Sequence, residues 1–202
     1  MKVSLQNVGK RYNREWIFRH LSFDFSPAGS YAITGSNGSG KSTLLQVVAG
    51  ATTNSEGTLL YAKHDGPVIT EPYRHIAIAA PYLELIEEFT AKELLDFHAG
   101  FKTLTASVEE ILASVHLEKA ADKQIRYFSS GMKQRLKLAQ AFFSESGMLL
   151  LDEPTTNLDS DGVSLYQGLL EKYTGNRLLI ISSNIPQEYA FCKELIRIED
   201  YK

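Results

Sequence analysis

The chain has 202 residues, which is long enough for one sizeable hydrophobic core with a subdomain but short for two independent domains. Hydrophobic residues make up 44% of the chain and charged residues 22%, the balance of an ordinary soluble protein. The net charge is −3 and Lys and Arg are scattered along the chain, so we expect no nucleic-acid partner.

Membrane-spanning and secreted proteins are also disfavoured. No apolar run approaches the roughly 20 residues that a spanning helix needs, and the first residues have no apolar signal core. We therefore expect a cytosolic protein that reaches a membrane only through a partner. The single cysteine, Cys192, cannot form an internal disulfide, so we expect a small buried residue rather than a nucleophile.

Strands are predicted over residues 2–34. Apolar residues mark the first strand near residues 3–8, and apolar runs at residues 16–18 and 21–25 mark two more. Tyr12 follows the first strand, and its ring could stack on a nucleotide base. Because aromatic residues are common in strands, the position of Tyr12 alone favours a strand residue.

A glycine-rich segment at residues 35–43 matches the phosphate-loop pattern G-x-x-x-x-G-K-[ST] at every fixed position. Residues 31–33 predict a buried strand before it, and residues 44–50 a helix that ends at its glycine. Glycines let phosphate approach the main-chain amides, Lys41 should reach the outer phosphates, and Ser42 should ligate the Mg²⁺ of a nucleoside triphosphate. An ordinary glycine-rich turn is the alternative. The expected nucleotide-binding residues are Gly35, Ser36, Asn37, Gly38, Ser39, Gly40, Lys41, Ser42 and Thr43.

After the loop helix, short strands are predicted at residues 58–61 and 75–80, with a turn at residues 63–67 between them. Residues 82–126 are helix-rich and carry many carboxylates, so we interpret them as a helical subdomain inserted into the nucleotide-binding core. One of its helices starts with the capping-box residues Thr90 and Glu93 and has as its apolar side Leu94, Leu95 and Phe97. A second amphipathic helix is marked by Val108, Ile111, Leu112 and Val115.

A second motif is the apolar run at residues 147–152, which predicts a strand buried on both faces, as in a parallel sheet. At its carboxyl end, Asp152 is placed to hold Mg²⁺ through its water shell and Glu153 to act as general base on the attacking water. A strand that merely ends in surface acids would look the same, but the upstream phosphate loop argues against it. Further strands are predicted at residues 178–183 and 194–198.

A third motif, at residues 128–135, precedes a long helix. Ser129 stands where an N-cap is expected, which predicts a helix start. A second phosphate-binding turn fits equally well, because serine hydroxyls and a helix N-terminus suit anions. The spacing leaves both interpretations open. The apolar stripe of the helix consists of Leu136, Ala139, Phe142 and Phe143.

In this order, the motifs resemble those of the ATP-binding subunits of ABC transporters, over nearly the whole chain. Residues 35–42 match the Walker A motif, and residues 149–152 match Walker B, followed by the catalytic Glu153. Residues 128–132 stand in the place of the Leu-Ser-Gly-Gly-Gln signature. The resemblance therefore implies nucleotide contacts from the signature residues Ser129, Ser130 and Gly131.

Two more positions follow from the resemblance. Residues 157–159 resemble the D-loop, which implies a role at the nucleotide for Asp159. Tyr12 falls where family members stack an aromatic residue on adenine, which reverses the interpretation from position alone.

The resemblance implies an α/β fold: a P-loop NTPase core with a mostly parallel sheet, an N-terminal antiparallel β subdomain and an inserted helical subdomain. Residues 1–202 would form a single ABC ATPase domain. Within it, residues 1–81 and 147–202 would be the core with the β subdomain, and residues from about 82 to 146 the helical subdomain with the signature turn.

ATP and Mg²⁺ are the cofactors that the resemblance implies. Two copies, as a homodimer or pseudo-dimer, would close head to tail with each ATP between Walker A of one and the signature turn of the other. A separately encoded transmembrane permease would choose the cargo and hold the subunit on the inner face of the membrane. Residues 82–89 are our candidate contact with it, although their apolar side chains could equally be local core.

Three departures from the family pattern matter. Ser130 and Met132 replace a glycine and the glutamine of the signature, which predicts tuning rather than loss. Asn184 occupies the place of the switch histidine, and it can hydrogen-bond a γ-phosphate but cannot carry a proton. Pro81 and Tyr82 stand where a glutamine normally helps to bind Mg²⁺ and water.

Two functional hypotheses follow. In the first, the chain is the ATP-hydrolysing subunit that powers a transporter, with Glu153, Lys41 and Asn184 as catalytic residues and with slowed hydrolysis. In the alternative, it is an ATP-dependent conformational switch that hydrolyses weakly and regulates a membrane or other partner. A translation-associated or DNA-repair relative is less favoured, because tandem cassettes and long coiled coils are absent. The length suggests a bare cassette without a regulatory domain.

Overall fold

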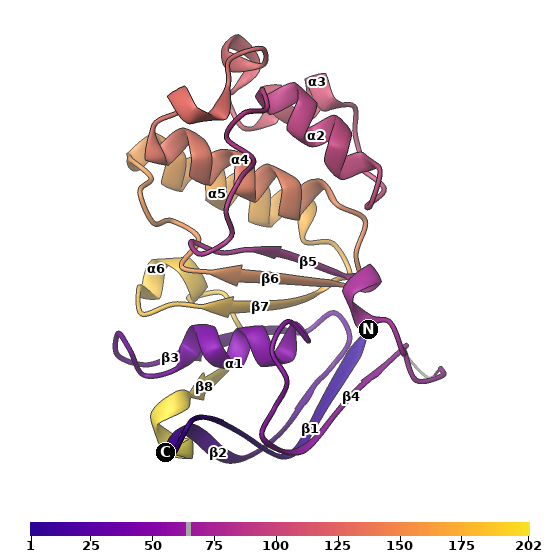
Figure 1. Cartoon of the computed structure of the whole chain (residues 1–202), viewed down its shortest axis with the longest axis vertical. Helices are drawn as coiled ribbons and strands as arrows, with labels where there is room; N and C mark the ends of the chain where they lie inside the picture. Colours follow the sequence, from indigo (N-terminus) through magenta and orange to yellow (C-terminus); the bar gives the residue numbers. More distant parts are fainter. Residues whose placement is uncertain (64–65) are drawn as a thin grey trace. The chain divides into compact units, whose positions relative to one another are not determined.

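The computed structural model describes residues 1–63 and 66–202, so the predicted turn at residues 63–67 lies partly outside the described residues. The chain divides into two compact units, whose elements are labelled in Figure 1. The first unit consists of Met1–Ile78, Ser146–Glu153 and Asn176–Lys202, and the second of Ala79–Glu145 and Pro154–Gly175. The organisation as a single ATPase domain with the expected internal boundaries stays a prediction.

An antiparallel sheet with the strand order β2–β1–β4 belongs to the first unit. Its strands are β1 (Lys2–Tyr12), β2 (Glu15–Phe25) and β4 (Glu56–Ala62). The prediction of two strands at residues 16–18 and 21–25 is wrong, because both runs lie in β2. His20, with a φ of 56°, sits between them, and the β1–β2 register shifts there. The strand therefore bends at an irregularity without ending.

A five-stranded sheet has the order β5–β6–β7–β3–β8. Its strands are β3 (Ser30–Thr34), β5 (Ile76–Ala79), β6 (Met148–Asp152), β7 (Leu178–Ser182) and β8 (Glu194–Arg197). The pairs β6–β7, β7–β3 and β3–β8 are parallel, which confirms the predicted mostly parallel sheet. Ser182 of β7 pairs with both Asp152 and Ile33. The carboxyl ends of three neighbouring strands therefore meet at one edge of the sheet.

Helix α1 (Lys41–Val48) joins the two sheets of the first unit into one core. It contacts β3, β6 and β7 of the parallel sheet and β1 of the antiparallel sheet. The helix is followed by Gly50, with a φ of 71°, as the sequence predicts. The shared core includes Leu5, Ile33, Leu44, Leu150 and Ile180. Short helical turns complete this unit: η1 (Pro72–His75), α6 (Pro186–Tyr189) and η4 (Ile198–Tyr201).

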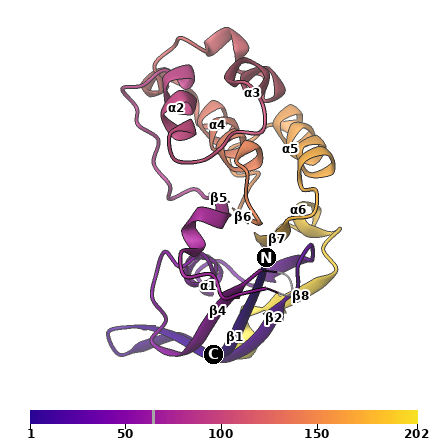
Figure 2. The same cartoon turned by 90° about the vertical axis from the view of Figure 1, so that its right-hand side faces the viewer.

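The second unit is helical, and Figure 2 labels its main helices. These are α2 (Ala91–Ala99), α3 (Val108–Ser114), α4 (Ser130–Phe143) and α5 (Ser160–Tyr173), with the short turns η2 (Glu118–Ala120) and η3 (Ile125–Tyr127). The predicted capping box of α2 is confirmed, and α3 has another, formed by Ser107 and Glu110. Helix α5 was not predicted from the sequence.

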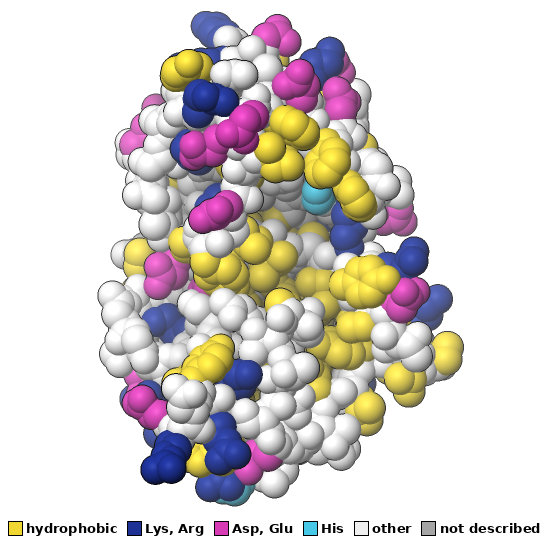
Figure 3. Space-filling model, viewed as in Figure 1, with side chains coloured by type: hydrophobic (Ala, Val, Ile, Leu, Met, Phe, Trp, Pro, Cys, Tyr) yellow, Lys and Arg dark blue, Asp and Glu magenta, His cyan; other side chains and the backbone are white. Residues whose placement is uncertain are grey.

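The predicted apolar side of α2 is buried only in part. Phe97 is 48% exposed, although Leu94 and Leu95 on the same helix are buried as expected. Its ring stacks edge-on against Phe89 and against Phe101, which is 74% exposed. Figure 3, which has the same view as Figure 1, shows apolar side chains gathered over α2. No helix among the described residues is long and apolar enough to cross a membrane.

Candidate functional site

The phosphate loop connects β3 to α1 in a conformation that only glycine adopts easily. Gly35, Gly38 and Gly40 have φ angles of 149°, 76° and 108°. A Cβ atom on Gly40 would lie 2.4 Å from Cγ2 of Ile17, whereas one on Gly38 would meet nothing within 4 Å. The loop is thus packed on its protein side at Gly40 and open at Gly38.

The Lys41 side chain is folded back onto this loop. Its Nζ donates hydrogen bonds to the carbonyl oxygens of Gly35, at 2.9 Å, and Ser36, at 3.1 Å. The side chain is buried, so the ammonium is held at the loop rather than in solvent. A triphosphate in the loop would offer this cation anionic oxygens, which bind it more strongly than neutral carbonyls do.

Asp152 ends β6 as a buried acid. The residue is 1% exposed, and neither carboxylate oxygen has a hydrogen-bond partner among the described residues. Burial raises the pKa of Asp152, with a smaller contribution from the charge of Glu153. The nearby Ser182 and Ser42 hydroxyls act in the opposite direction and lower the pKa, although neither hydroxyl completes a hydrogen bond to the carboxylate. A buried carboxylate left unpaired in this way is suited to an additional cationic ligand.

Two hydroxyls near this edge are also unpaired. Ser39 Oγ in the loop and Ser182 Oγ at the end of β7 are buried, and neither has a hydrogen-bond partner among the described residues. Such groups normally have a protein, water or ligand partner, so the unpaired hydroxyls mark polar positions that a bound ligand or its water can complete.

Glu153 follows Asp152 in a strained backbone conformation. Its φ is 43°, a value that residues other than glycine rarely adopt, and its N–H donates to the carbonyl oxygen of Ser182 at 2.8 Å. The bond to the neighbouring strand fixes the sharp turn. The side chain is only partly exposed. Strain of this kind is concentrated at functional sites, which supports the predicted catalytic role without testing it.

Asn184 contacts the phosphate loop. Its Nδ2 donates to Oδ1 of Asn37 at 2.9 Å. The preceding residue, Ser183, is anchored by its N–H, which donates to the carbonyl oxygen of Ile33 at 3.1 Å. The segment after β7 is therefore tied to β3 and to the loop, and the predicted switch position lies beside Walker A.

Tyr12 lies at the end of β1 in the same unit, with 47% of its surface exposed. The Lys10 ammonium lies 4.8 Å from the centroid of the Tyr12 ring and donates to the carbonyl oxygen of Thr53 at 2.8 Å. The ring is thus held by a cation–π contact but remains partly open to solvent. Its role as a platform for adenine stays a prediction.

The remaining predicted site residues lie in the second unit. Ser129 caps α4, and its Oγ accepts a hydrogen bond from the N–H of Met132 at 3.2 Å, which confirms the predicted helix start. Asp159 caps α5 by accepting from the N–H of Gly162 at 2.8 Å. A Cβ on Gly131 would lie 2.9 Å from the carbonyl oxygen of Asn157, so the signature turn packs closely against the D-loop segment. These capping bonds leave the predicted nucleotide contacts untested.

A hollow of about 330 Å³ in the second unit is lined by residues between 81 and 87 and by Lys133 and Lys137 of α4. The Lys137 ammonium donates to the carbonyl oxygens of Pro81, at 2.9 Å, and Ala80, at 3.3 Å. Lysine thus binds the backbone at the place where the family pattern has its glutamine. Tyr82, Leu83 and Ile86 are all exposed by more than a third, so part of the candidate contact segment faces solvent.

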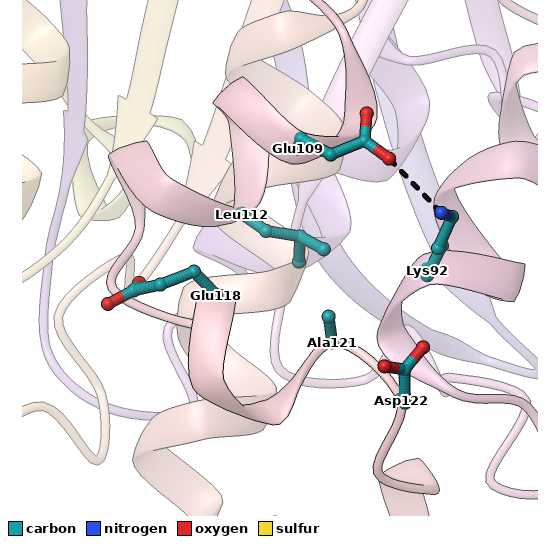
Figure 4. A pocket seen from close by; sticks show the side chains of 6 residues that line it. All are labelled: Lys92, Glu109, Leu112, Glu118, Ala121 and Asp122. Carbon is teal, nitrogen blue, oxygen red and sulfur yellow. Dashed lines mark ion pairs between the residues drawn. The ribbon is translucent and has the colours of Figure 1, made fainter.

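Another hollow, of about 250 Å³, lies between α2, α3 and η2 (Figure 4). Lys92 and Glu109 point toward each other there and form an ion pair of 3.1 Å. Glu118 and Asp122 also line this hollow. An acid-rich lining repels a triphosphate, so this cavity is not a candidate nucleotide site.

Two contacts that shape these motifs were not predicted from the sequence. Glu199 of η4 accepts a hydrogen bond from the N–H of Ser36 in the phosphate loop at 2.7 Å. Gln134 of α4 is buried, and its Nε2 donates to the carbonyl oxygen of Pro154 at 2.8 Å. Glu199 lies outside all three motifs, whereas Gln134 lies within the third motif, where no contact was predicted for it. A polar Gln134 close to the buried stripe of α4 was the only available signal.

Comparison with known proteins identifies the family. A family model described as ABC transporter matches residues 18–156. The chain belongs to the ABC transporter family. This ABC transporter protein is 31% identical over 194 residues to the Nod factor export ATP-binding protein I of Rhizobium johnstonii, an alignment that covers 92% of the chain and 62% of that relative. It is 29% identical over 188 residues to the cytochrome c biogenesis ATP-binding export protein CcmA of Rhizobium etli, covering 91% and 87%.

Solved structures show the same fold. A bacterial ABC transporter cassette determined as a dimer matches with a TM-score of 0.82 and 21% identity. The same cassette in a post-hydrolysis state bound to ADP and Pi matches with a TM-score of 0.81 and 24% identity. Each match covers 96% of this chain and 93% of the other. The ABC ATPase fold predicted from the motifs is confirmed.

Proposed function

We propose that this chain binds ATP and hydrolyses it to power transport by a membrane ABC transporter. The observation that carries the proposal is the juxtaposition, in one compact unit, of the glycine-built phosphate loop, the buried Lys41 and the unpaired Asp152. Family membership and the ATP-binding relatives support it.

The residues present fit Mg²⁺. Asp152 offers two unpaired carboxylate oxygens and Ser42 a hydroxyl, and a hard cation prefers such oxygen ligands. Among the described residues, no three His, Cys, Asp or Glu side chains are grouped to hold a metal. We therefore assign Ser42 and Asp152 as protein ligands, direct or through water, with the remaining ligands from ATP and solvent. When bound, Mg²⁺ supplies positive charge to the phosphates.

In the proposed reaction, a water oxygen bonds to the γ-phosphorus while the bond from this phosphorus to the β–γ bridging oxygen breaks, which releases ADP and inorganic phosphate. Glu153 accepts a proton from the attacking water. Lys41 neutralises charge on the outer phosphates, and the loop amides hold them in place. Asn184 positions the γ-phosphate or the water by hydrogen bonding through its amide, which lies beside the loop at Asn37. Because an amide cannot exchange a proton as histidine does, we expect slower turnover than in members with a histidine.

Two copies of the chain would complete the site. The dimeric cassette of the same fold supports this arrangement, in which Ser129, Ser130 and Gly131 of one copy approach the ATP of the other. Asp159 would act near the same interface, and Tyr12 would stack on adenine.

We assign the membrane contact to residues 82–89. A hollow beside this segment and its exposed apolar side chains offer a surface for a transmembrane permease, which we expect to be separately encoded. Such a partner would place the ATPase on the inner face of the membrane. The cargo would be chosen by the permease.

A second function is favoured by two observations. Asn184 replaces the proton-carrying residue, and Lys137 binds the backbone where the family glutamine is missing. We expect both changes to weaken hydrolysis more than ATP binding, so an ATP-dependent conformational switch is the alternative.

The proposal is tested by steady-state phosphate release from the purified subunit with its membrane partner. We expect Glu153→Gln to reduce turnover by at least about 100-fold, the usual contribution of a general base. The control is Glu171→Gln on the exposed face of α5, which should keep wild-type turnover. Equal turnover in wild type and Glu153→Gln would remove Glu153 from the mechanism. ATP-dependent dimerisation without measurable release would favour the switch.

A further inference from the structure

Glu199 holds the entry of the phosphate loop. Its Oε1 accepts hydrogen bonds from the N–H of Ser36, at 2.7 Å, and from the Ser36 hydroxyl, at 3.2 Å. The sheet register explains the contact, because Thr34 of β3 pairs with Arg197 of β8. Strands β3 and β8 therefore end at the same level of the sheet. Ser36 and Glu199, each two residues beyond this pair, lie next to each other.

The segment that carries Glu199 is fixed on both sides. Ile198 is fully buried, and Tyr201 packs against the core of the first unit. A Cβ on Gly35 would lie 2.7 and 2.8 Å from the two carboxylate oxygens. Gly35 is therefore required for the approach of Glu199 as well as for its own backbone conformation.

The Glu199 carboxylate lies beside an anion-binding loop, and its negative charge repels phosphate. The hydrogen bond from the Ser36 amide keeps the pKa of Glu199 below its ordinary value, so the group is ionised at neutral pH. Its charge is directed at the amide of Ser36, near the start of the loop. The amides in the first turn of α1 have no acceptor within the helix and stay suited to phosphate.

We propose that Glu199 is a positioning residue for nucleotide binding: its carboxylate fixes Gly35 and Ser36 so that the later loop amides remain aimed at the phosphates. This inference rests on the proposed function. Without the carboxylate, the entry of the loop would sample other conformations, and ATP would have to order it on binding.

The test compares Glu199→Ala, Glu199→Gln and the control Asp200→Asn, whose side chain is exposed. Magnesium-ATP binding is measured by calorimetry, and exchange of the Ser36 amide proton is measured by NMR on nucleotide-free protein. We expect Glu199→Ala to weaken ATP binding about tenfold and to speed Ser36 exchange. Glu199→Gln should restore both within about twofold, because its carbonyl still accepts the Ser36 hydrogen bond. Asp200→Asn should match wild type.

Several results would overturn the inference. Wild-type affinity in Glu199→Ala would refute the positioning role, and tighter binding in Glu199→Ala or Glu199→Gln would show that the carboxylate opposes ATP. If wild type itself binds no ATP, the proposed function fails. If the exchange rate of the Ser36 amide proton is unchanged in Glu199→Ala, the contact between Glu199 and the loop is refuted, whatever the ATP affinity. Should Glu199→Ala not fold, Glu199→Asp, which keeps the charge but shortens the reach, takes its place with the same expectations.

Discussion

Replacing Asp152 by asparagine should stabilise the nucleotide-free protein. The carboxylate is almost fully buried, and neither oxygen has a partner among the described residues. An unsatisfied buried polar group costs about 1–3 kcal/mol, and a charge costs more. Asparagine has nearly the same shape without the charge, so Asp152→Asn should raise the free energy of unfolding by about 1–3 kcal/mol. For a chain of this size, that corresponds to a rise in Tm of roughly 3–10 °C.

The increase in the free energy of unfolding caused by Asp152→Asn should depend on pH. Burial raises the pKa of Asp152 above its ordinary value of 3.8 in the folded protein. The folded state therefore takes up this proton at a higher pH than the unfolded state does, and wild type gains stability as the pH falls through the raised pKa. The advantage of Asp152→Asn should be largest near neutral pH and should shrink between the raised pKa and about 3.8.

Thermal unfolding of nucleotide-free wild type, Asp152→Asn and the control Asp96→Asn, followed by circular dichroism from pH 7 to pH 4, measures the effect. Asp96 is exposed on α2, so its substitution should change Tm little at any pH. Adding magnesium-ATP should raise the Tm of wild type more than that of Asp152→Asn. A lower Tm for Asp152→Asn at pH 7 would show that the carboxylate is already paired, and the reasoning would be refuted.

Three other predictions concern single residues. Gly40→Ala should destabilise the protein by about 1–3 kcal/mol in thermal unfolding, because its φ of 108° is strained for alanine and the methyl would meet Ile17; an unchanged Tm would contradict this. Gln134→Ala should cost about 1–3 kcal/mol in urea unfolding, since it removes the buried bond to Pro154; a loss below 0.5 kcal/mol would count against the contact. Burial raises the pKa of Cys192 to about 12, so its thiol should react with a disulfide reagent far more slowly at pH 8 than in unfolded protein; equal rates would show an accessible thiolate.

The phosphate loop, the buried strand that ends at Asp152 and the cap at Ser129 were predictable because each depends on residues close together in sequence. A glycine-rich segment between a strand and a helix predicts a phosphate loop, and an apolar run predicts a strand buried on both faces. The strand order was not predicted, and Asn184 was placed at the switch position only by resemblance to the family; in the structure its amide hydrogen-bonds Asn37 of the loop.

The remaining features depend on tertiary contacts that no local pattern encodes. Glu199 bonds to Ser36 across 163 positions of sequence, and the register of β8 against β3 decides that contact. His20 interrupts the alternation of apolar and polar residues in β2. The strand does not end there, because β2 pairs with β1 on both sides of the register shift. Phe97 was assigned to the apolar side of its helix, but the sequence did not show that its ring stacks with Phe101 and stays 48% exposed.

The central claim is that the loop at residues 35–43 grips a triphosphate through its amides and Lys41. Isothermal titration of the purified chain with magnesium-ATP, beside Lys41→Ala, tests it most directly. We predict saturable heat of binding for wild type and a loss of affinity of at least about tenfold for Lys41→Ala, since a charge-assisted bond to phosphate is removed. No heat for wild type, or identical titrations for the two proteins, would contradict the claim.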